Sequence, residues 1–195
     1  MKHGNIIQIL KNDGVGVMAT DTIYGLVGSA LSKKAVERIY KLKKRTPSKP
    51  FIILISDFND LKFFNIKIDQ FTKKLLQKIW PNPVSVILPC NDAKFAYLHR
   101  ETKTLAFRIP QKPDLLELLQ QTVPLVAPSA NPEGLPPAQT IKEAKKYFND
   151  QVDFYQDEGK LISEPSTLIE IKNRKTNILR QGIYNSQILA SSEDG

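Results

Sequence analysis

The chain has 195 residues, of which 41% are hydrophobic and 25% are charged. This length and composition predict one globular domain that buries enough surface to fold without a disulfide or a structural metal. The single cysteine excludes an intrachain disulfide, and two histidines are too few for most zinc sites. The apolar run from Phe51 to Ile55 is too short to cross a bilayer, and no secretory core follows the N-terminus. A soluble, cytoplasmic protein with no membrane association is therefore expected.

The formal net charge is +8, and most of it lies in residues 32–49, which we call the basic window. This window holds eight lysines and arginines against the single acid Glu37, a net charge of +7. Such a concentration of positive charge attracts phosphate, on a nucleotide or on a nucleic acid. The alternative is a lysine-rich, solvated helix face, which is the commoner explanation of a charge run taken alone.

Short apolar runs alternate with helical patterns along the chain. In chain order, the predicted elements are a helix at 6–10, a strand at 15–19, a helix from the N-cap Ser32 to Pro47, a strand at 51–55, a helix from Asp69 to Trp80, strands at 84–88 and 105–109, a helix at 114–121, a strand at 123–127, a helix from the capping box of Thr140 and Glu143 to Asn149, and strands around 154, at 167–171 and at 177–179. This order predicts an α/β fold of three layers, with helices flanking one twisted mixed β-sheet. Residues 1–185 are expected to form a single domain and residues 186–195 a disordered tail.

Four polar stretches lie at the ends of predicted strands or in loops, where α/β proteins place binding sites. The first, Thr20 to Leu26, combines two threonine hydroxyls, a carboxylate and a glycine that permits close approach of a ligand. The second, Lys43 to Pro50, is a cationic corner held between prolines, and its Arg and Lys side chains suit a polyphosphate.

The third stretch contains Arg108 inside an apolar strand, where an unpaired charge is costly. Its guanidinium therefore needs either a structural ion pair or a ligand anion, and the pattern leaves both open. The fourth stretch, residues 124–134, carries Ser129 and Asn131 in a Pro/Gly-rich turn, where both could serve only the turn itself. The chain has neither a P-loop nor a Gly-x-Ser-x-Gly elbow, and no basic residue adjoins Cys90, so covalent catalysis is poorly supported.

In order and spacing, the polar stretches resemble the threonylcarbamoyl-AMP synthase family of the YrdC/TsaC type, over roughly residues 6–182. The segments that match the family pattern are Ala19–Leu26, Lys43 with Arg45 and Lys49, Trp80–Pro83, Leu105–Pro110, Ser129–Asn131, Pro165–Thr167 and Leu179–Gly182. The chain departs from that pattern at Ala19, Thr46, Asn82, Glu133 and Pro137. The length resembles that of the short, single-domain members.

This resemblance implies a YrdC-like fold and a nucleotidyltransferase that condenses L-threonine, bicarbonate or CO2, and ATP into threonylcarbamoyl-AMP and diphosphate. The product would supply the threonylcarbamoyl group of adenosine 37 in tRNAs reading codons that begin with A. It implies tRNA threonylcarbamoyl transferase proteins as downstream partners and leaves direct tRNA binding open. Mg2+ would arrive with the triphosphate, and no protein metal site is implied.

Carried over position by position, the resemblance also implies the site residues. Those for threonine are Thr22, Arg108, Ala127 and Ser166. Those for ATP are Lys43, Arg45, Lys49, Thr104, Ser129, Asn131 and Arg180, with Lys43 and Arg45 as the catalytic residues.

Two other functions compete with this prediction. One is a non-catalytic RNA-binding module of the same fold, for which the basic window would suit a phosphate backbone. The other is a carbamoyl-adenylating domain with a different acceptor. An RNA groove needs no amino-acid pocket, so the grouping of Thr22, Arg108 and Ser166 discriminates against the first.

Overall fold

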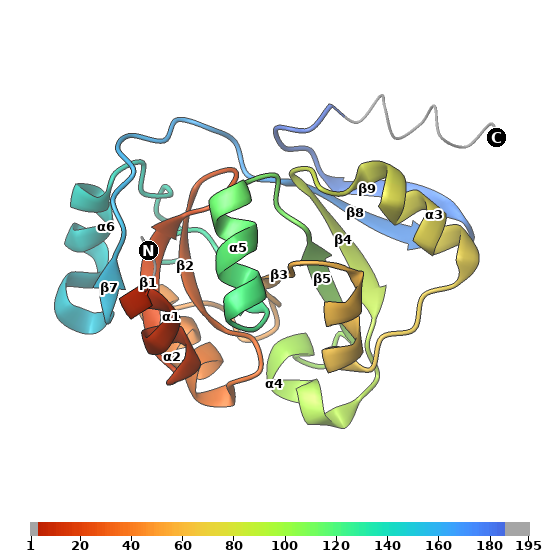
Figure 1. The fold of residues 1–195 in the computed structure, drawn as a ribbon, viewed down its shortest axis with the longest axis horizontal. Coiled ribbons are helices and arrows are strands. Elements are labelled where there is room, and N and C mark those ends of the chain that lie inside the picture. The colour runs from red at the N-terminus through yellow and green to blue at the C-terminus, as the bar shows by residue number, and fades with distance from the viewer. Residues whose placement is uncertain (1–3, 186–195) are drawn as a thin grey trace.

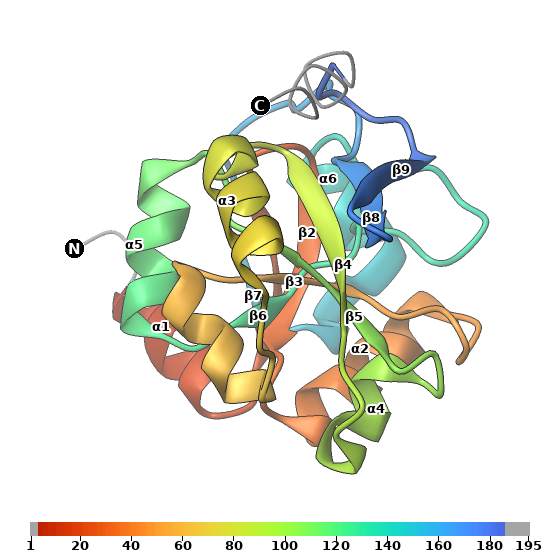
Figure 2. The ribbon, with the colours of Figure 1, turned by 90° about the vertical axis from the view of Figure 1, so that its right-hand side faces the viewer.

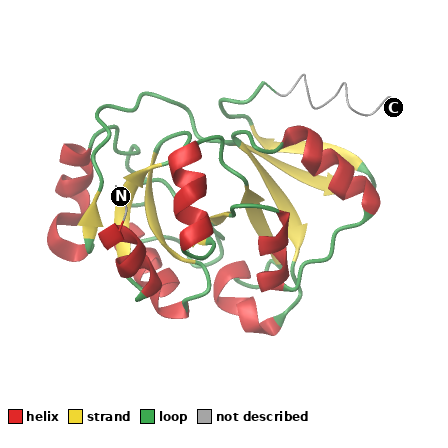
Figure 3. Cartoon of the chain, viewed as in Figure 1, coloured by secondary structure: helices red, strands yellow, loops and turns green. Residues whose placement is uncertain are grey.

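The structure is a computed structural model that describes residues 4–185. Within them, nine strands form one mixed sheet in the order β7-β1-β2-β6-β3-β5-β4-β8-β9 (Figure 1). The strands are β1 (Val15–Ala19), β2 (Tyr24–Ser29), β3 (Ile52–Leu54), β4 (Val84–Pro89), β5 (Thr104–Arg108), β6 (Leu125–Val126), β7 (Phe154–Tyr155), β8 (Thr167–Lys172) and β9 (Lys175–Arg180). The helices are α1 (Gly4–Lys11), α2 (Lys33–Lys43), α3 (Gln70–Ile79), α4 (Ala96–His99), α5 (Pro113–Gln121) and α6 (Ile141–Phe148), with 3-10 turns at Phe58–Phe64, Ala93–Phe95 and Asn149–Gln151 (Figure 3).

The two faces of the sheet bury different side chains, as the alternation along β1 requires. Met18 packs with leucines of α1 and α5 on one face, whereas Val15 and Val17 belong to the cluster that contains the apolar residues of α2 and α6 on the other. Figure 2 shows α1 and α5 on one side of the strands and α2 and α6 on the other. The predicted three-layer α/β fold with a mixed sheet is confirmed.

Polar N-caps begin the predicted helices at the expected positions. The side chains of Ser32, Asp69 and Thr140 accept hydrogen bonds from the N–H groups of Ala35, Thr72 and Glu143, and so satisfy donors that a helix start leaves unpaired. The carboxylate of Glu143 accepts from the N–H of Gln139, one residue before the cap. Helix α2 ends at Lys43 rather than Pro47, because Lys44 adopts a left-handed C-cap.

Strand β2 is the main element that the sequence did not predict. Its six residues are all buried, and its pairing with β1 and β6 makes it a central strand. Two glycines weaken the β pattern there. Helix α2 packs closely against Gly28: a Cβ atom at this position would lie 3.1 Å from Cδ1 of Ile39, a tight contact.

Residues 186–195, predicted as a tail, lie outside the described residues, and the single-domain prediction remains a prediction. Among the helices of residues 4–185, none is long and apolar enough to cross a membrane.

The segment after β9 lies directly against the start of β8. The N–H of Ile183 donates to the carbonyl of Pro165 at 3.1 Å, and the N–H of Gly182 donates to Oγ1 of Thr167 at 3.1 Å. A Cβ atom at Gly182 would lie 2.1 Å from the Pro165 carbonyl oxygen. Only glycine therefore permits this backbone approach.

We expect Gly182→Ala to lower the free energy of unfolding by about 1–3 kcal/mol, because the added methyl group meets backbone rather than a movable side chain. Urea denaturation measures the change. Gly4→Ala is the matched control: nothing lies within 4 Å of that position, so its stability should stay the same or rise slightly. Equal stabilities for the two variants would contradict the close packing.

Candidate functional site

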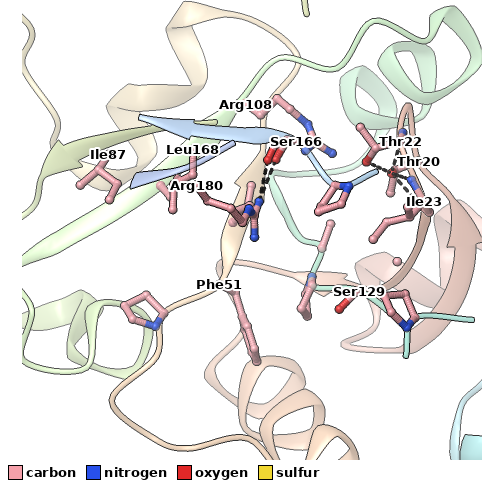
Figure 4. Close-up of a pocket in the computed structure, with 18 of the residues that line it drawn as sticks. Thr20, Thr22, Ile23, Phe51, Ile87, Arg108, Ser129, Ser166, Leu168 and Arg180 are labelled. Atoms are coloured by element: carbon pink, nitrogen blue, oxygen red, sulfur yellow. Dashed lines mark hydrogen bonds between the residues drawn. The ribbon is translucent and has the colours of Figure 1, made fainter. Parts of the chain in front are cut away.

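A cavity of about 380 Å³ lies where the predicted polar stretches meet (Figure 4). Eight of the eleven predicted binding residues line it: Thr22, Arg45, Thr104, Arg108, Ala127, Ser129, Ser166 and Arg180. Lys43, Lys49 and Asn131 do not. Residues separated by up to 158 positions, from Thr22 to Arg180, thus border one space.

The sheet brings these stretches together through short backbone pairings. Residues 128–130 run beside the start of β2, where Leu26 donates its N–H to the Pro128 carbonyl at 2.8 Å and Ala130 donates to the Tyr24 carbonyl at 2.9 Å. This pairing sets Ser129 opposite Gly25. Strands β3 and β5 run parallel, so the carboxyl end of β5, with Arg108, meets the carboxyl end of β3 at the same edge.

Arg108 forms the structural ion pair that was one of the two alternatives left open by the sequence, and its contact with a ligand anion remains a prediction. Its Nη2 forms an ion pair with Oδ1 of Asp21 at 2.9 Å, and the two side chains are only 4% and 1% exposed. Burial lowers the pKa of Arg108, and the Asp21 carboxylate opposes that shift. Arg108 also lines the cavity, and its buried Nε has no hydrogen-bond partner within the described chain. A structural ion pair and an available donor therefore coexist in one side chain.

Arg180 reaches the cavity from the end of β9. Its Nη2 donates to the carbonyl of Ser166 at 2.8 Å and to Oγ of Ser166 at 3.3 Å, the contacts drawn in Figure 4. Burial lowers the pKa of Arg180, and repulsion from Arg45 lowers it further. Repulsion from Arg180 likewise lowers the pKa of Arg108.

The described lining of the cavity includes the three arginines Arg45, Arg108 and Arg180 and no aspartate or glutamate. Asp21 compensates only one of the three charges. The cavity is therefore suited to an anionic ligand with several charged oxygens. In residues 4–185, no three His, Cys, Asp or Glu side chains are grouped so that they could hold a metal ion.

Lys43 lies behind the cavity wall, and only 1% of it is exposed. Its Nζ donates to the carbonyl oxygens of Ser129 and Asn131 at 2.5 and 2.6 Å. Asn131 in turn donates its side-chain N–H groups to the carbonyls of Pro132 and Leu135 at 3.0 and 2.6 Å. In the structure, Lys43 and Asn131 thus hold the turn that presents Ser129, and their predicted contact with ATP remains a prediction.

Lys49 pairs with Glu133, at 2.5 Å between Nζ and Oε1. The other oxygen of Glu133 accepts hydrogen bonds from the N–H and the hydroxyl of Thr46 at 2.6 and 2.9 Å. These contacts hold the pKa of Glu133 at about 2, with the Lys49 hydrogen bond as the largest cause. Glu133 therefore joins the loop of residues 44–50 to the turn after Ser129, and no local pattern in the sequence indicated this role.

The basic window is divided between two environments. Lys33, Lys34, Lys41 and Lys44 are exposed, as the solvated-face alternative expected. The others face partners: Arg38 pairs with Asp153 at 2.6 Å, and Arg45 donates from Nε to the Lys49 carbonyl at 2.9 Å with its guanidinium 5.3 Å from the centre of the Phe51 ring. Arg45 is the one cation of the window that lines the cavity.

The sequence did not single out the apolar side of the cavity. Phe51, Ile87, Leu168 and Pro165 line it, and so does Pro137, one of the departures from the family pattern. The signal available was weak: Phe51 and Ile87 lie in predicted strands and are indistinguishable there from ordinary core residues.

Fold and site together define an α/β protein with a cationic, partly apolar cavity that is suited to anionic ligands. Residues 8–182 match the model of the Sua5/YciO/YrdC family, whose description reads "Telomere recombination". The chain belongs to this family.

Several relatives of the chain are named threonylcarbamoyl-AMP synthase. It is 32% identical to a putative threonylcarbamoyl-AMP synthase of Methanocaldococcus jannaschii, over 95% of this chain and 89% of that protein. It is 34% identical to the threonylcarbamoyl-AMP synthase of Nitrosococcus oceani, over 75% of this chain and 80% of that one. The solved structure of Pyrococcus abyssi Sua5 complexed with L-threonine has a TM-score of 0.89 to this fold at 26% identity; the match covers 97% of this chain and 56% of the Sua5 chain.

The buried ammonium group of Lys43 gives stability a specific pH dependence. Burial, with repulsion from Arg45 second, lowers its pKa from 10.5 to about 7. Between those values the unfolded chain binds more protons than the folded one, so this group makes stability rise with pH from 7 towards 10. From pH 7 to 9, the wild type should gain up to about 2 kcal/mol of unfolding free energy relative to Lys43→Met, which lacks the titrating group. Urea denaturation of both proteins at the two pH values measures this, and parallel pH profiles would contradict it.

Proposed function

We propose that this chain is a threonylcarbamoyl-AMP synthase, which condenses L-threonine, bicarbonate or CO2, and ATP into threonylcarbamoyl-AMP and diphosphate. The observation that carries the proposal is the cavity in which Arg45, Arg108 and Arg180 converge without an acidic residue in the described lining. ATP and bicarbonate are anions and L-threonine carries a carboxylate, so each of them brings a negative group that a guanidinium can bind. The names of the relatives and the L-threonine complex of Sua5 support the same activity.

The threonine end of the site is assigned to Arg108, Thr22, Ala127 and Ser166. The free Nε of Arg108 supports a contact with the threonine carboxylate, because a buried guanidinium N–H without an acceptor is costly until a ligand supplies one. Thr22 contributes a hydroxyl that lies 3.1 Å from the hydroxyl of Thr20. This pair can both donate and accept, as the hydroxyl group of threonine requires.

The ATP end is assigned to Arg45, Thr104, Ser129 and Arg180, which line the cavity. Lys43 and Asn131 support this end through the turn that carries Ser129. Lys49 can reach a phosphate only by leaving Glu133, so its contact with the triphosphate requires an exchange of one anion for another. Mg2+ would enter on the triphosphate, since the described cavity lining offers no carboxylate ligand.

The proposed reaction needs positioning and charge stabilisation rather than a nucleophilic side chain. The threonine amine adds to CO2 and loses a proton, which gives a carbamate; bicarbonate gives the same carbamate with loss of water. A carbamate oxygen then attacks the α-phosphorus, the bond to the bridging oxygen breaks, and diphosphate leaves with the bonding electrons. The arginines lower the repulsion between the anionic carbamate and the triphosphate and stabilise the leaving diphosphate.

The product would pass to tRNA threonylcarbamoyl transferase proteins for modification of adenosine 37. The exposed lysines of α2 leave a surface on which tRNA could bind directly. The decisive assay is diphosphate release from ATP with bicarbonate, with and without L-threonine, followed by transfer to tRNA in the presence of the transferase proteins. Diphosphate release that does not depend on threonine would favour the carbamoyl-adenylating alternative. No release of diphosphate would favour the RNA-binding alternative.

Arg45→Ala tests the ATP end. We expect ATP affinity to fall by roughly ten- to a hundredfold, the effect of losing a charge-assisted hydrogen bond of about 1.5–3 kcal/mol. Lys41→Ala removes the same charge from an exposed position of α2 and should change the affinity by less than about threefold. Calorimetric titration measures both, and equal effects would show that only the general field of the basic window matters.

Arg108→Met combined with Asp21→Asn tests the threonine end. Arg108→Met alone would leave the Asp21 carboxylate buried and unpaired, at a cost of about 3–5 kcal/mol, so loss of activity would be ambiguous. The double variant removes both charges and should fold with a melting temperature near that of Asp21→Asn or above. We expect no threonine-dependent diphosphate release and ATP affinity within about threefold of the wild type. Retained threonine binding in the double variant would remove Arg108 from the threonine site.

A further inference from the structure

Two serine hydroxyls form a buried pair at the wall of the cavity. Oγ of Ser85, in β4, lies 2.8 Å from Oγ of Ser166, just before β8. The two residues are 0% and 1% exposed. The parallel pairing of β4 with β8, in which Ser85 stands opposite Leu168, sets this approach. Ser166 lines the cavity and Ser85 does not, so a ligand can meet Ser85 only through Ser166.

The donors and acceptors around this pair can be assigned one by one. The guanidinium of Arg180 can only donate, so Oγ of Ser166 is the acceptor of its 3.3 Å contact. The hydroxyl of Ser85 has one hydrogen-bond partner among the described residues, Oγ of Ser166. A buried hydroxyl proton without an acceptor is costly, so Ser85 donates to Ser166 rather than accepting from it.

This assignment determines what Ser166 can offer a ligand. With Arg180 and Ser85 both donating to it, Oγ of Ser166 has used its two lone pairs. Its own proton then has no acceptor among the described protein groups, and the remaining direction leads to the cavity that Ser166 lines. An anionic oxygen of a ligand in the cavity would accept this proton and complete the hydrogen bonds of the Ser166 hydroxyl.

We propose that Ser85 is a positioning residue that commits Ser166 to donate its proton to the threonine carboxylate. It acts by holding the Ser166 side chain in one rotamer and by occupying the lone pair that could otherwise face the ligand. This inference rests on the proposed function, since it takes threonine to be the ligand beside Ser166.

Kinetics of Ser85→Ala, with threonine and ATP varied separately, test the inference. The KM for threonine should rise roughly three- to tenfold, the effect of one neutral hydrogen bond, while the KM for ATP stays within about twofold. Ser85→Cys keeps a weak donor of similar size and should fall between the wild type and Ser85→Ala. Ser163→Ala makes the same chemical change at an exposed residue of the same segment and should alter neither constant.

The double variant Ser85→Ala/Ser166→Ala separates a positioning role from a structural one. Without Ser166, the Ser85 hydroxyl has no acceptor, so adding Ser85→Ala should cause no further rise in the KM for threonine and should raise the melting temperature above that of Ser166→Ala. Additive losses, or equal losses for threonine and ATP in Ser85→Ala, would overturn the positioning role.

The same set of variants distinguishes the two proposals from each other. If Ser166→Ala raises the KM for threonine and Ser85→Ala does not, the inference about Ser85 fails while the threonine site stands. If Ser166→Ala itself leaves the KM for threonine unchanged in an active, threonine-dependent enzyme, Ser166 is not a threonine ligand and both assignments fail at this residue.

Discussion

Holding three guanidinium groups around one cavity is the electrostatic constraint on which the rest of this structure depends. Each group is anchored by protein acceptors that use only part of its donors. Arg108 pairs with Asp21, Arg45 donates to the Lys49 and Pro50 carbonyls, and Arg180 donates to Ser166. Their remaining donors are available to the cavity, and because no acid lines its described walls, an anionic ligand can complete the compensation of charge.

The fold meets this constraint by drawing each anchor from a different part of the chain. Asp21 follows β1, Lys49 and Pro50 precede β3, and Ser166 precedes β8, so no single loop carries the site. Gly182 then lets the chain return so closely that Ser166 and Arg180 share contacts. A site built in this way is preorganised by the sheet, which is the property that a reaction without a nucleophilic side chain requires.

Much of this could be predicted from the sequence, because strand and helix patterns are local. The periodic runs and polar N-caps located the helices that flank the sheet, and the family motifs gathered eight residues that line one cavity. Strand β2 was missed because two glycines interrupt its β pattern, and the close packing of Gly28 against α2 is a property of the fold rather than of the segment. The sequence could state that Arg108 needs an anion, but it could not choose Asp21 as that anion.

The partners of the basic window were beyond prediction for the same reason. Lys43 bonds to Ser129 and Asn131, and Lys49 to Glu133, across 84 to 88 positions of the chain. Counted along the sequence, these lysines add to a positive field. In the folded structure, however, Lys43 holds the turn that carries Ser129. The charge of Lys49 is already paired with the carboxylate of Glu133, whose pKa is about 2. A net charge read from a sequence therefore overstates the field that a ligand meets.

The position of Arg180 connects the two ends of the proposed reaction. It bonds to Ser166 at the threonine end, and repulsion from Arg45 at the ATP end lowers its pKa. A carbamate and a triphosphate repel each other at reacting distance, and the repulsion grows in a site from which water is excluded. Arg180, bonded to Ser166 and within electrostatic range of Arg45, is placed to oppose this repulsion. The same geometry explains why the site needs no acidic residue in its walls: any carboxylate placed there would add to the charge that the arginines have to offset.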